Sequence, residues 1–142
     1  MTNKPDINKD PIGYAREVVG KDPLASFLGI TIDEVRDKYA RCSLRIKDDY
    51  LNAVERAHGG IIHALADQAF AVACNSFGVM AVALSFNIDY VAAALPGDTI
   101  YAEASSVNVA NKVSVWDINV KDSKGGLVAA GRGIAYHKLA KK

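Results

Sequence analysis

The chain has 142 residues, enough for one domain with one hydrophobic core. Half of the residues are hydrophobic and 23% are charged, an ordinary globular composition, and a net charge of +1 argues against nucleic-acid binding. The first ten residues are polar and no run of about 20 apolar residues occurs, so we expect a cytoplasmic protein with no membrane partner. Cys42 and Cys74 lack metal-ligand spacing and are expected to be reduced core thiols.

The beginning of the chain predicts two short helical segments. One helical pattern begins at Pro11 and ends at Gly20, and a second, capped by an aspartate, ends at Gly29. We therefore expect residues 1–23 to be an N-terminal lead-in with a short helix and residues 24–142 to form a single domain.

The rest of the chain predicts strands on both sides of one apolar helix. Alternation of apolar and polar residues predicts a hairpin of two strands between residues 30 and 47, and helical spacing predicts a helix from about Gly60 to Asn75. Short connections between the later strands predict an antiparallel meander. These four strands are expected at Ala81–Ala92, Thr99–Val109, Val113–Asp122 and Leu127–Lys138. The fold class is α+β.

The segment from the Gly pair to the middle of the helix carries the candidate chemistry. Gly59 and Gly60 leave backbone N–H groups uncovered where a helix begins, and such groups can bind an anion or a developing oxyanion. Asp67 lies among apolar residues, where an ionised carboxylate costs several kcal/mol unless it is paired or solvated. Asp67 is either a structural carboxylate or a functional base. His58, just before the Gly pair, is either structural or catalytic.

The spacing of these residues bears on how a site could be built. Gly59 and Asp67 are eight residues apart, roughly 12 Å along one helix, so one reacting carbonyl group cannot touch both. A site that uses both must take one of them from a second subunit, with the two helices antiparallel. His63 and Asp67 are one turn apart, but no third ligand is evident, so we expect no metal.

The motifs of this chain resemble those of hot-dog-fold acyl-CoA thioesterases of the phenylacetate-pathway (PaaI) type. The resemblance extends from about Leu24 to His137. It rests on the spacing of the Asn, His-Gly-Gly and Asp residues together with two downstream motifs. These are Asn52-x5-His58-Gly59-Gly60-x6-Asp67, Asn87-Ile88-Asp89-Tyr90 and Leu95-Pro96-Gly97-Asp98.

This resemblance implies a long central helix wrapped by a curved antiparallel sheet of five to six strands. It also implies a homodimer or homotetramer whose active sites lie at the dimer interface, acyl-CoA as substrate and no cofactor. In such enzymes the residue matching Gly59 polarises the thioester carbonyl, and the carboxylate matching Asp67, from the other subunit, activates water or attacks directly. The residue matching Asn52 places the substrate or water, and the residue matching His58 orients the loop or the thioester.

The resemblance implies the reaction but does not identify the acyl group of the substrate. Gly60, Ala71 and Ser85 are candidate substrate-binding residues; Ala71 stands where some of these enzymes have Ser or Thr, and Ser85 is the nearest hydroxyl on the strand after the helix. Arg132 and Lys138 could hold the coenzyme A phosphates or be ordinary surface charges. We expect an aryl or short-to-medium acyl group. The alternatives are a hot-dog hydratase or dehydratase and a non-catalytic acyl-CoA-binding protein.

Overall fold

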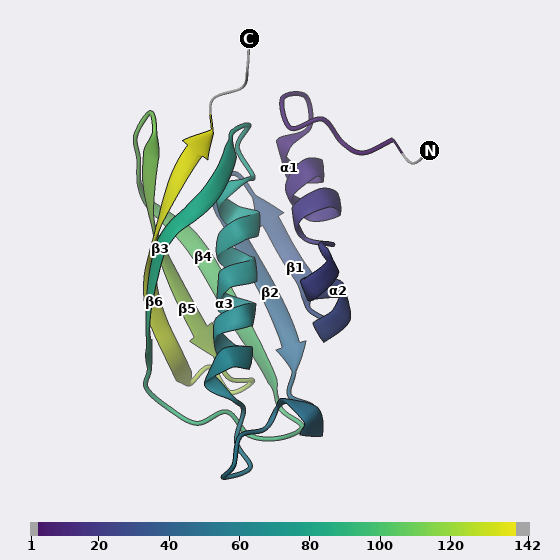
Figure 1. Cartoon of the computed structure of the whole chain (residues 1–142), viewed down its shortest axis with the longest axis vertical. Helices are drawn as coiled ribbons and strands as arrows, with labels where there is room; N and C mark the ends of the chain where they lie inside the picture. The colour runs from purple at the N-terminus through teal and green to yellow at the C-terminus, as the bar shows by residue number, and fades with distance from the viewer. Residues whose placement is uncertain (1–2, 139–142) are drawn as a thin grey trace.

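The computed structural model describes residues 3–138 of the chain (Figure 1). Within these residues no helix is long and apolar enough to span a membrane. In chain order the elements are α1 (Pro11–Tyr14), the π-helical turn η1 (Ala15–Val19), α2 (Pro23–Leu28), β1 (Thr31–Arg36), β2 (Tyr39–Arg45), the 3-10 turn η2 (Asp48–Tyr50), α3 (Gly59–Cys74), β3 (Met80–Tyr90), β4 (Thr99–Val109), β5 (Val113–Lys121) and β6 (Leu127–Lys138).

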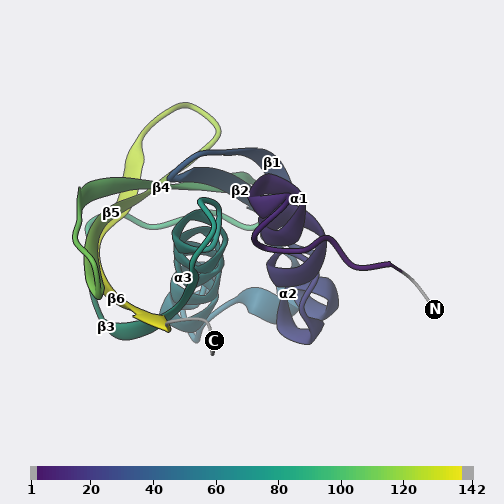
Figure 2. The ribbon, with the colours of Figure 1, turned by 90° about the horizontal axis from the view of Figure 1, so that it is seen from above.

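The six strands form one antiparallel sheet in the order β1-β2-β4-β5-β6-β3. Figure 2 shows the sheet curving around α3, with α1 and α2 on the side of α3 away from β5 and β6. This is the predicted α+β class and the hot-dog arrangement of a long helix wrapped by a sheet.

The prediction of a four-strand meander after α3 is wrong for its first strand. β3 pairs with β6 and not with β4, so only β4, β5 and β6 follow one another as neighbours. Residues 91–98 instead cross beneath the start of α3, where Ala57 N–H donates to Ala94 O (2.9 Å) and Ile46 N–H donates to Asp98 O (2.8 Å). Ala94 is buried at this crossing, and the connection leads from β3 at the edge of the sheet to β4 in its interior.

The hydrophobic core lies between α3 and the concave face of the sheet. Leu65, Ala69 and Val72 of α3 are fully buried, as is Trp116 of β5. Both cysteines are free and buried, which confirms their expected place in the core. Asn75 joins the end of α3 to β3, since its side-chain amide donates to Ala81 O (3.1 Å) and its Oδ1 accepts from Ala81 N (3.0 Å).

The N-terminal helices pack against α3. Ala15 is fully buried, and the side-chain amide of the buried Gln68 donates to Val19 O at 2.9 Å. Tyr50 holds the end of α2 through a 2.6 Å hydrogen bond from its hydroxyl to Leu28 O. The predicted stop at Gly29 is confirmed by its left-handed backbone (φ 80°), which ends α2.

Among residues 3–138, strand β3 is an edge strand that pairs on one side only, with β6. Its register shifts between Ala83 and Ser85, so one extra residue bulges from the ladder. Met80, Val82 and Leu84 are exposed, with 61% of Leu84 accessible. An apolar edge strand of this length is a template for pairing with another chain.

Candidate active site

Helix α3 begins at an N-cap formed by His58. The His58 backbone is extended (φ −62°, ψ 138°), and its Nδ1 accepts a 2.9 Å hydrogen bond from the backbone N–H of Gly60. Since Nδ1 is the acceptor, the ring proton of the neutral histidine lies on Nε2. The Gly60 N–H is therefore used within the chain and is not open to a ligand, contrary to the expectation that both glycine amides are uncovered.

The Gly59 N–H is the amide that stays open. None of the hydrogen bonds formed among residues 3–138 uses it, and as the first residue of α3 it has no intrahelical acceptor. The ring of Tyr90 lies beside it, because a Cβ on Gly59 would be 3.4–3.6 Å from three of its atoms. The amide borders a cleft of about 400 Å³ that also has Asn52 and Tyr90 in its wall.

Asn52 organises the loop that leads into α3. Its Oδ1 accepts from Val54 N (3.0 Å) and Arg56 N (3.1 Å), and its own N–H donates to Arg56 O (2.7 Å). These bonds hold a tight turn in which Glu55 has a positive φ of 58°. The Asn52 oxygen is thus taken up by the loop, and Nδ2 is the part of its side chain that could donate to a ligand.

Asp67 borders a second cleft of about 400 Å³. The Asp67 side chain reaches solvent in the single chain, although the residues around its backbone are apolar. Burial raises the pKa of Asp67, His63 opposes this shift, and the negative charge of Asp22 adds to it. A carboxylate with a raised pKa is a stronger base than one in water. The other residues that line this cleft are Tyr14, Val19, Asp22, Phe70, Ala71, Cys74, Asn75, Met80, Ala81, Val82 and Ala83.

The two clefts lie toward opposite ends of α3 and share no lining residue. The structure brings Asn52, His58 and Gly59 together at the start of the helix and leaves Asp67 two turns away, roughly 12 Å along the axis. Within one chain the amide and the carboxylate cannot meet on one substrate carbonyl.

Residues 55–129, just over half of the chain, match the family model described as the thioesterase superfamily. The chain belongs to the thioesterase superfamily. A protein of Archaeoglobus fulgidus that carries only a provisional esterase name is 41% identical over 115 residues, 81% of this chain and 75% of that protein.

Two further relatives have informative names or structures. The acyl-coenzyme A thioesterase PaaI of Escherichia coli K12 is 34% identical over 122 residues, 86% of this chain and 87% of that protein. The solved structure of E. coli PaaI superposes with a TM-score of 0.88 at 30% identity, covering 94% of this chain and 97% of that one. A Streptococcus mutans protein solved with acetyl-CoA has a TM-score of 0.75 at 25% identity, covering 80% and 91%.

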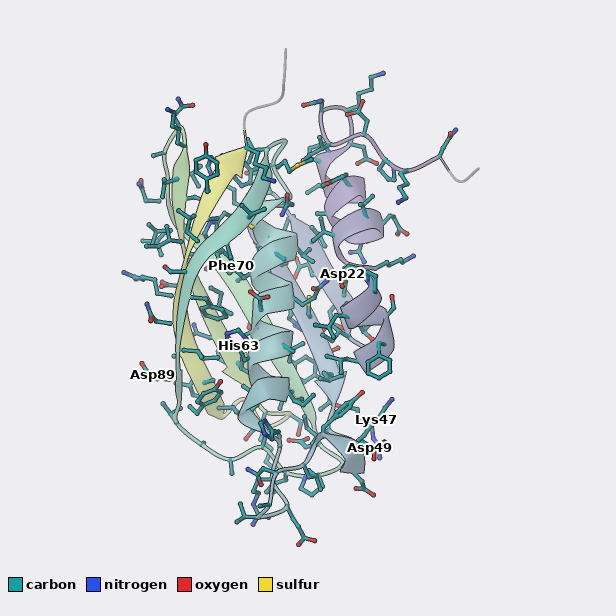
Figure 3. All side chains as sticks on the ribbon, in the orientation of Figure 1. Asp22, Lys47, Asp49, His63, Phe70 and Asp89 are labelled. Carbon is teal, nitrogen blue, oxygen red and sulfur yellow. The ribbon has the colours of Figure 1, made fainter. Side chains whose placement is uncertain are left out.

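In this thioesterase, His63 lies on α3 between the two clefts. Its ring is 5.1 Å from the ring of Phe86 on β3, and Phe86 meets Phe70 edge-on at 5.7 Å. Figure 3 shows His63 and Phe70 on the side of α3 that faces β3. Residues 3–138 contain no group of three or more His, Cys, Asp or Glu side chains that could hold a metal.

The strand after α3 places Ala83, and not Ser85, in the wall of the Asp67 cleft. The β-bulge between the two residues sets this register, and the position of such a bulge is not evident from the alternation of residues. Ala71, one turn beyond Asp67, does line the cleft, so both positions near the carboxylate are methyl groups and neither supplies a hydroxyl.

Neither of the two basic candidates of β6 lines either cleft. Arg132 is opposite Asp117 on β5 and pairs with it at 2.9 Å, which occupies its guanidinium. Lys138 is exposed at the end of β6, opposite Met80. The structure therefore places neither Arg132 nor Lys138 in the wall of the cleft that contains Asp67 or the cleft that contains Gly59.

Sequence reasoning missed two contributors to the clefts of the thioesterase. The N-terminal helices bring Tyr14, Val19 and Asp22 to the wall of the Asp67 cleft. No local sequence pattern predicts this long-range packing. Tyr90 was visible within the Asn87–Tyr90 motif, but its position beside Gly59 depends on how the end of β3 meets the start of α3.

Proposed function

We propose that the protein hydrolyses acyl-CoA thioesters to a carboxylic acid and coenzyme A, in active sites shared by two subunits. The observation that carries the proposal is the separation of the two reacting groups: the open Gly59 N–H is at the start of α3, and the Asp67 carboxylate, whose pKa is raised, is near the middle of the same helix. The similarity to an acyl-coenzyme A thioesterase supports the substrate class, as does that to a protein solved with acetyl-CoA.

The proposed reaction uses both groups on one carbonyl. The Gly59 N–H of one subunit donates to the thioester oxygen, where negative charge develops, and one such donor contributes on the order of 3 kcal/mol to transition-state stability. Asp67 of the other subunit takes a proton from water while the water oxygen bonds to the acyl carbon. Alternatively the Asp67 carboxylate attacks the acyl carbon, and water then hydrolyses the resulting mixed anhydride to release the acid and restore Asp67. In both routes the carbon–sulfur bond breaks and coenzyme A leaves as a thiolate, with neither metal nor cofactor required.

A homodimer formed through β3 fits this division. The free edge of β3 can pair with the β3 edge of a second copy, which covers the exposed apolar side chains of Met80, Val82 and Leu84. The open face of α3 between β3 and the N-terminal helices would then meet the same face of the partner's α3 (Figure 1). A homotetramer would be built from two such dimers.

The remaining candidate residues support the two reacting groups. His58 and Asn52 fix the loop and the helix start that present Gly59, with Gly60 held by His58. Phe70, Tyr14 and the methyl group of Ala71 line the Asp67 cleft. A cleft of about 400 Å³ with aromatic walls suits an aryl or short-to-medium acyl group.

Thiol release from a panel of acyl-CoAs tests the activity. We expect wild-type protein to release coenzyme A and Asp67→Ala to lose at least 100-fold in kcat. Asp37→Ala is the matched control, since Asp37 is an exposed carboxylate whose contact is an ion pair with its neighbour Lys38. Activity that survives in Asp67→Ala, or binding of acyl-CoA without thiol release by the wild type, contradicts the proposal.

Complementation tests whether the site is shared. Gly59→Pro removes the amide proton and Asp67→Ala removes the carboxylate, so each homodimer is inactive. A mixed dimer has one site with both defects and one intact site, so co-expression restores about a quarter of wild-type activity if subunits pair at random. No recovery in a sample that contains mixed dimers would place both groups in one subunit.

A further inference from the structure

Asp22, the N-cap of α2, lies in the wall of the Asp67 cleft. A shared carbonyl group holds it beside α3, because Val19 O accepts from the Asp22 N–H at 3.3 Å and from the side-chain amide of Gln68 at 2.9 Å. Gln68 directly follows Asp67 on α3. Figure 3 shows Asp22 on the side of the N-terminal helices nearest α3.

One oxygen of the Asp22 carboxylate caps α2 and the other is free. Oδ1 accepts from the backbone N–H of Ala25 at 2.9 Å, whereas Oδ2 takes part in no hydrogen bond or ion pair formed among residues 3–138. A helix cap needs an acceptor and no charge, since Asn and Ser cap helices about as well as Asp. The negative charge of Asp22 is therefore not required by the cap.

No positive side chain balances this charge in the cleft. Among residues 3–138, none of those that line the cleft is a lysine, an arginine or a histidine. The two cations nearest Asp22 in the chain are Arg16 and Lys21, which line a separate cleft, where Lys21 pairs with Glu17. The Asp67 cleft therefore presents two carboxylates, those of Asp22 and Asp67, and no cation.

Two other titratable side chains line the cleft and a third lies near it. The wall contains the hydroxyl of Tyr14 and the thiol of Cys74, whose pKa burial raises to about 12, and β3 adds only apolar side chains. His63, one turn before Asp67 on α3, acts against the effect of burial on the pKa of Asp67, and the charge of Asp22 acts with it. Asp22 and Asp67 are thus close enough for one charge to act on the other.

We infer that Asp22 is a specificity-determining residue, whose negative charge excludes acyl groups that end in a carboxylate from the Asp67 cleft. The inference rests on the proposed function, in which this cleft holds the acyl group of the thioester. An anionic acyl group would lose water there and meet two negative charges with no cation to pair with. Arg56 lines the cleft that Gly59 borders, so in the shared site the partner would bring this cation to the coenzyme A side of the thioester.

Two substrates of equal acyl length measure the exclusion. Hexanoyl-CoA ends in a methyl group and adipyl-CoA in a carboxylate. The wild type should prefer hexanoyl-CoA in kcat/KM, but any apolar cleft disfavours a carboxylate, so the variants decide. Asp22→Asn keeps the capping oxygen and removes the charge. It should raise kcat/KM for adipyl-CoA relative to hexanoyl-CoA by about 10-fold, mainly through KM, as expected for two charges several Å apart at a partly exposed site.

The pH dependence of kcat with hexanoyl-CoA is a second readout, which a capping role alone would not change. Asp67 must be ionised to act as a base, so kcat falls as the pH drops through its pKa. The charge of Asp22 raises that pKa, so Asp22→Asn should move this acid limb to lower pH. An acid limb that does not move would mean that the charge of Asp22 does not reach the cleft, and would overturn the inference.

Asp10→Asn is the matched control. Asp10 caps α1 in the same way, with its Oδ1 accepting from the Gly13 N–H at 2.9 Å, and it lines neither cleft. Its substitution should change neither the substrate ratio nor the acid limb. Asp22→Ser is a second neutral cap, with the same expected result as Asp22→Asn, should the amide impair folding. A change of equal size in Asp10→Asn would overturn the inference.

The outcomes separate this inference from the proposed function. If the wild type hydrolyses hexanoyl-CoA and both Asp22 variants keep its substrate ratio, the inference fails and the proposed function stands. If the wild type releases no thiol from any acyl-CoA, the proposed function fails and the inference fails with it. A raised adipyl-CoA ratio in the Asp22 variants, with Asp10→Asn unchanged, supports both.

Discussion

The backbone N–H of Gly60 donates to Nδ1 of His58 across 2.9 Å, and this bond determines which amide of the Gly pair remains available. By capping α3, the imidazole satisfies one amide at the helix start. The neighbouring Gly59 N–H is left as the donor that can reach a substrate. The part assigned to His58 is therefore to hold the backbone, which its replacement can test.

His58→Ala removes the cap. We expect a loss of about 1 kcal/mol in the free energy of unfolding and a fall in kcat of about 10-fold, because the Gly59 N–H is less firmly placed. His58→Asn, whose side-chain oxygen can also accept from Gly60, should recover most of both quantities. Thermal unfolding and steady-state kinetics measure them. If His58→Asn is stable but as inactive as His58→Ala, the ring has a chemical role.

Gly59→Pro removes the proposed oxyanion donor without removing the helix. Proline is favoured at the first helical position, and the extended backbone of His58 suits a residue before proline. We expect kcat to fall by about 10²–10³ with helix content unchanged by circular dichroism.

Gly59→Ala is the matched control, since it keeps the N–H. Its Cβ would meet the Tyr90 ring at 3.4 Å, an ordinary contact, so kcat should stay within about 10-fold of wild type. Equal activities of the proline and alanine variants would exclude this amide as a donor.

At neutral pH the ionised Asp67 side chain should lower the free energy of unfolding. Its pKa in the fold is raised by burial, so the ionised form is less favourable there than in the unfolded chain, whose aspartates titrate near 3.8. At pH 7 Asp67→Asn should therefore raise Tm, by about 1–2 °C because the side chain reaches solvent. The gain should shrink as the pH falls and disappear below 3.8.

Thermal scans of Asp67→Asn and wild type at equal protein concentration, from pH 7 to pH 3.5, measure this difference. Asp37→Asn should leave Tm unchanged throughout, as a control for the loss of one negative charge. A lower Tm for Asp67→Asn at pH 7 would mean that the ionised carboxylate makes a net stabilising contact, either within the chain or with the partner's helix start in the proposed dimer.

The sequence predicts the helices and strands well because local rules decide them. Alternation along β2, the cap of α2 by Asp22 and the apolar run of α3 each depend on neighbouring residues only. Strand order does not, since whether β3 pairs with β4 or β6 depends on the buried crossing of residues 91–98. The same limit applies to the site: spacing separates Gly59 from Asp67, but the bulge that brings Ala83 to the cleft arises from pairing.

Gly133 of β6 makes room for Phe70, which supports the Asp67 cleft. A Cβ at this position would lie 2.5–3.0 Å from three atoms of the buried Phe70 ring, closer than side chains tolerate. We expect Gly133→Ala to lower the free energy of unfolding by about 1–3 kcal/mol and to raise KM, because the displaced ring narrows the cleft. Urea unfolding with Phe70→Leu as the second substitution completes a double-mutant cycle. The smaller side chain should remove most of the Gly133→Ala penalty, and strictly additive losses would show that the two residues do not compete for this space.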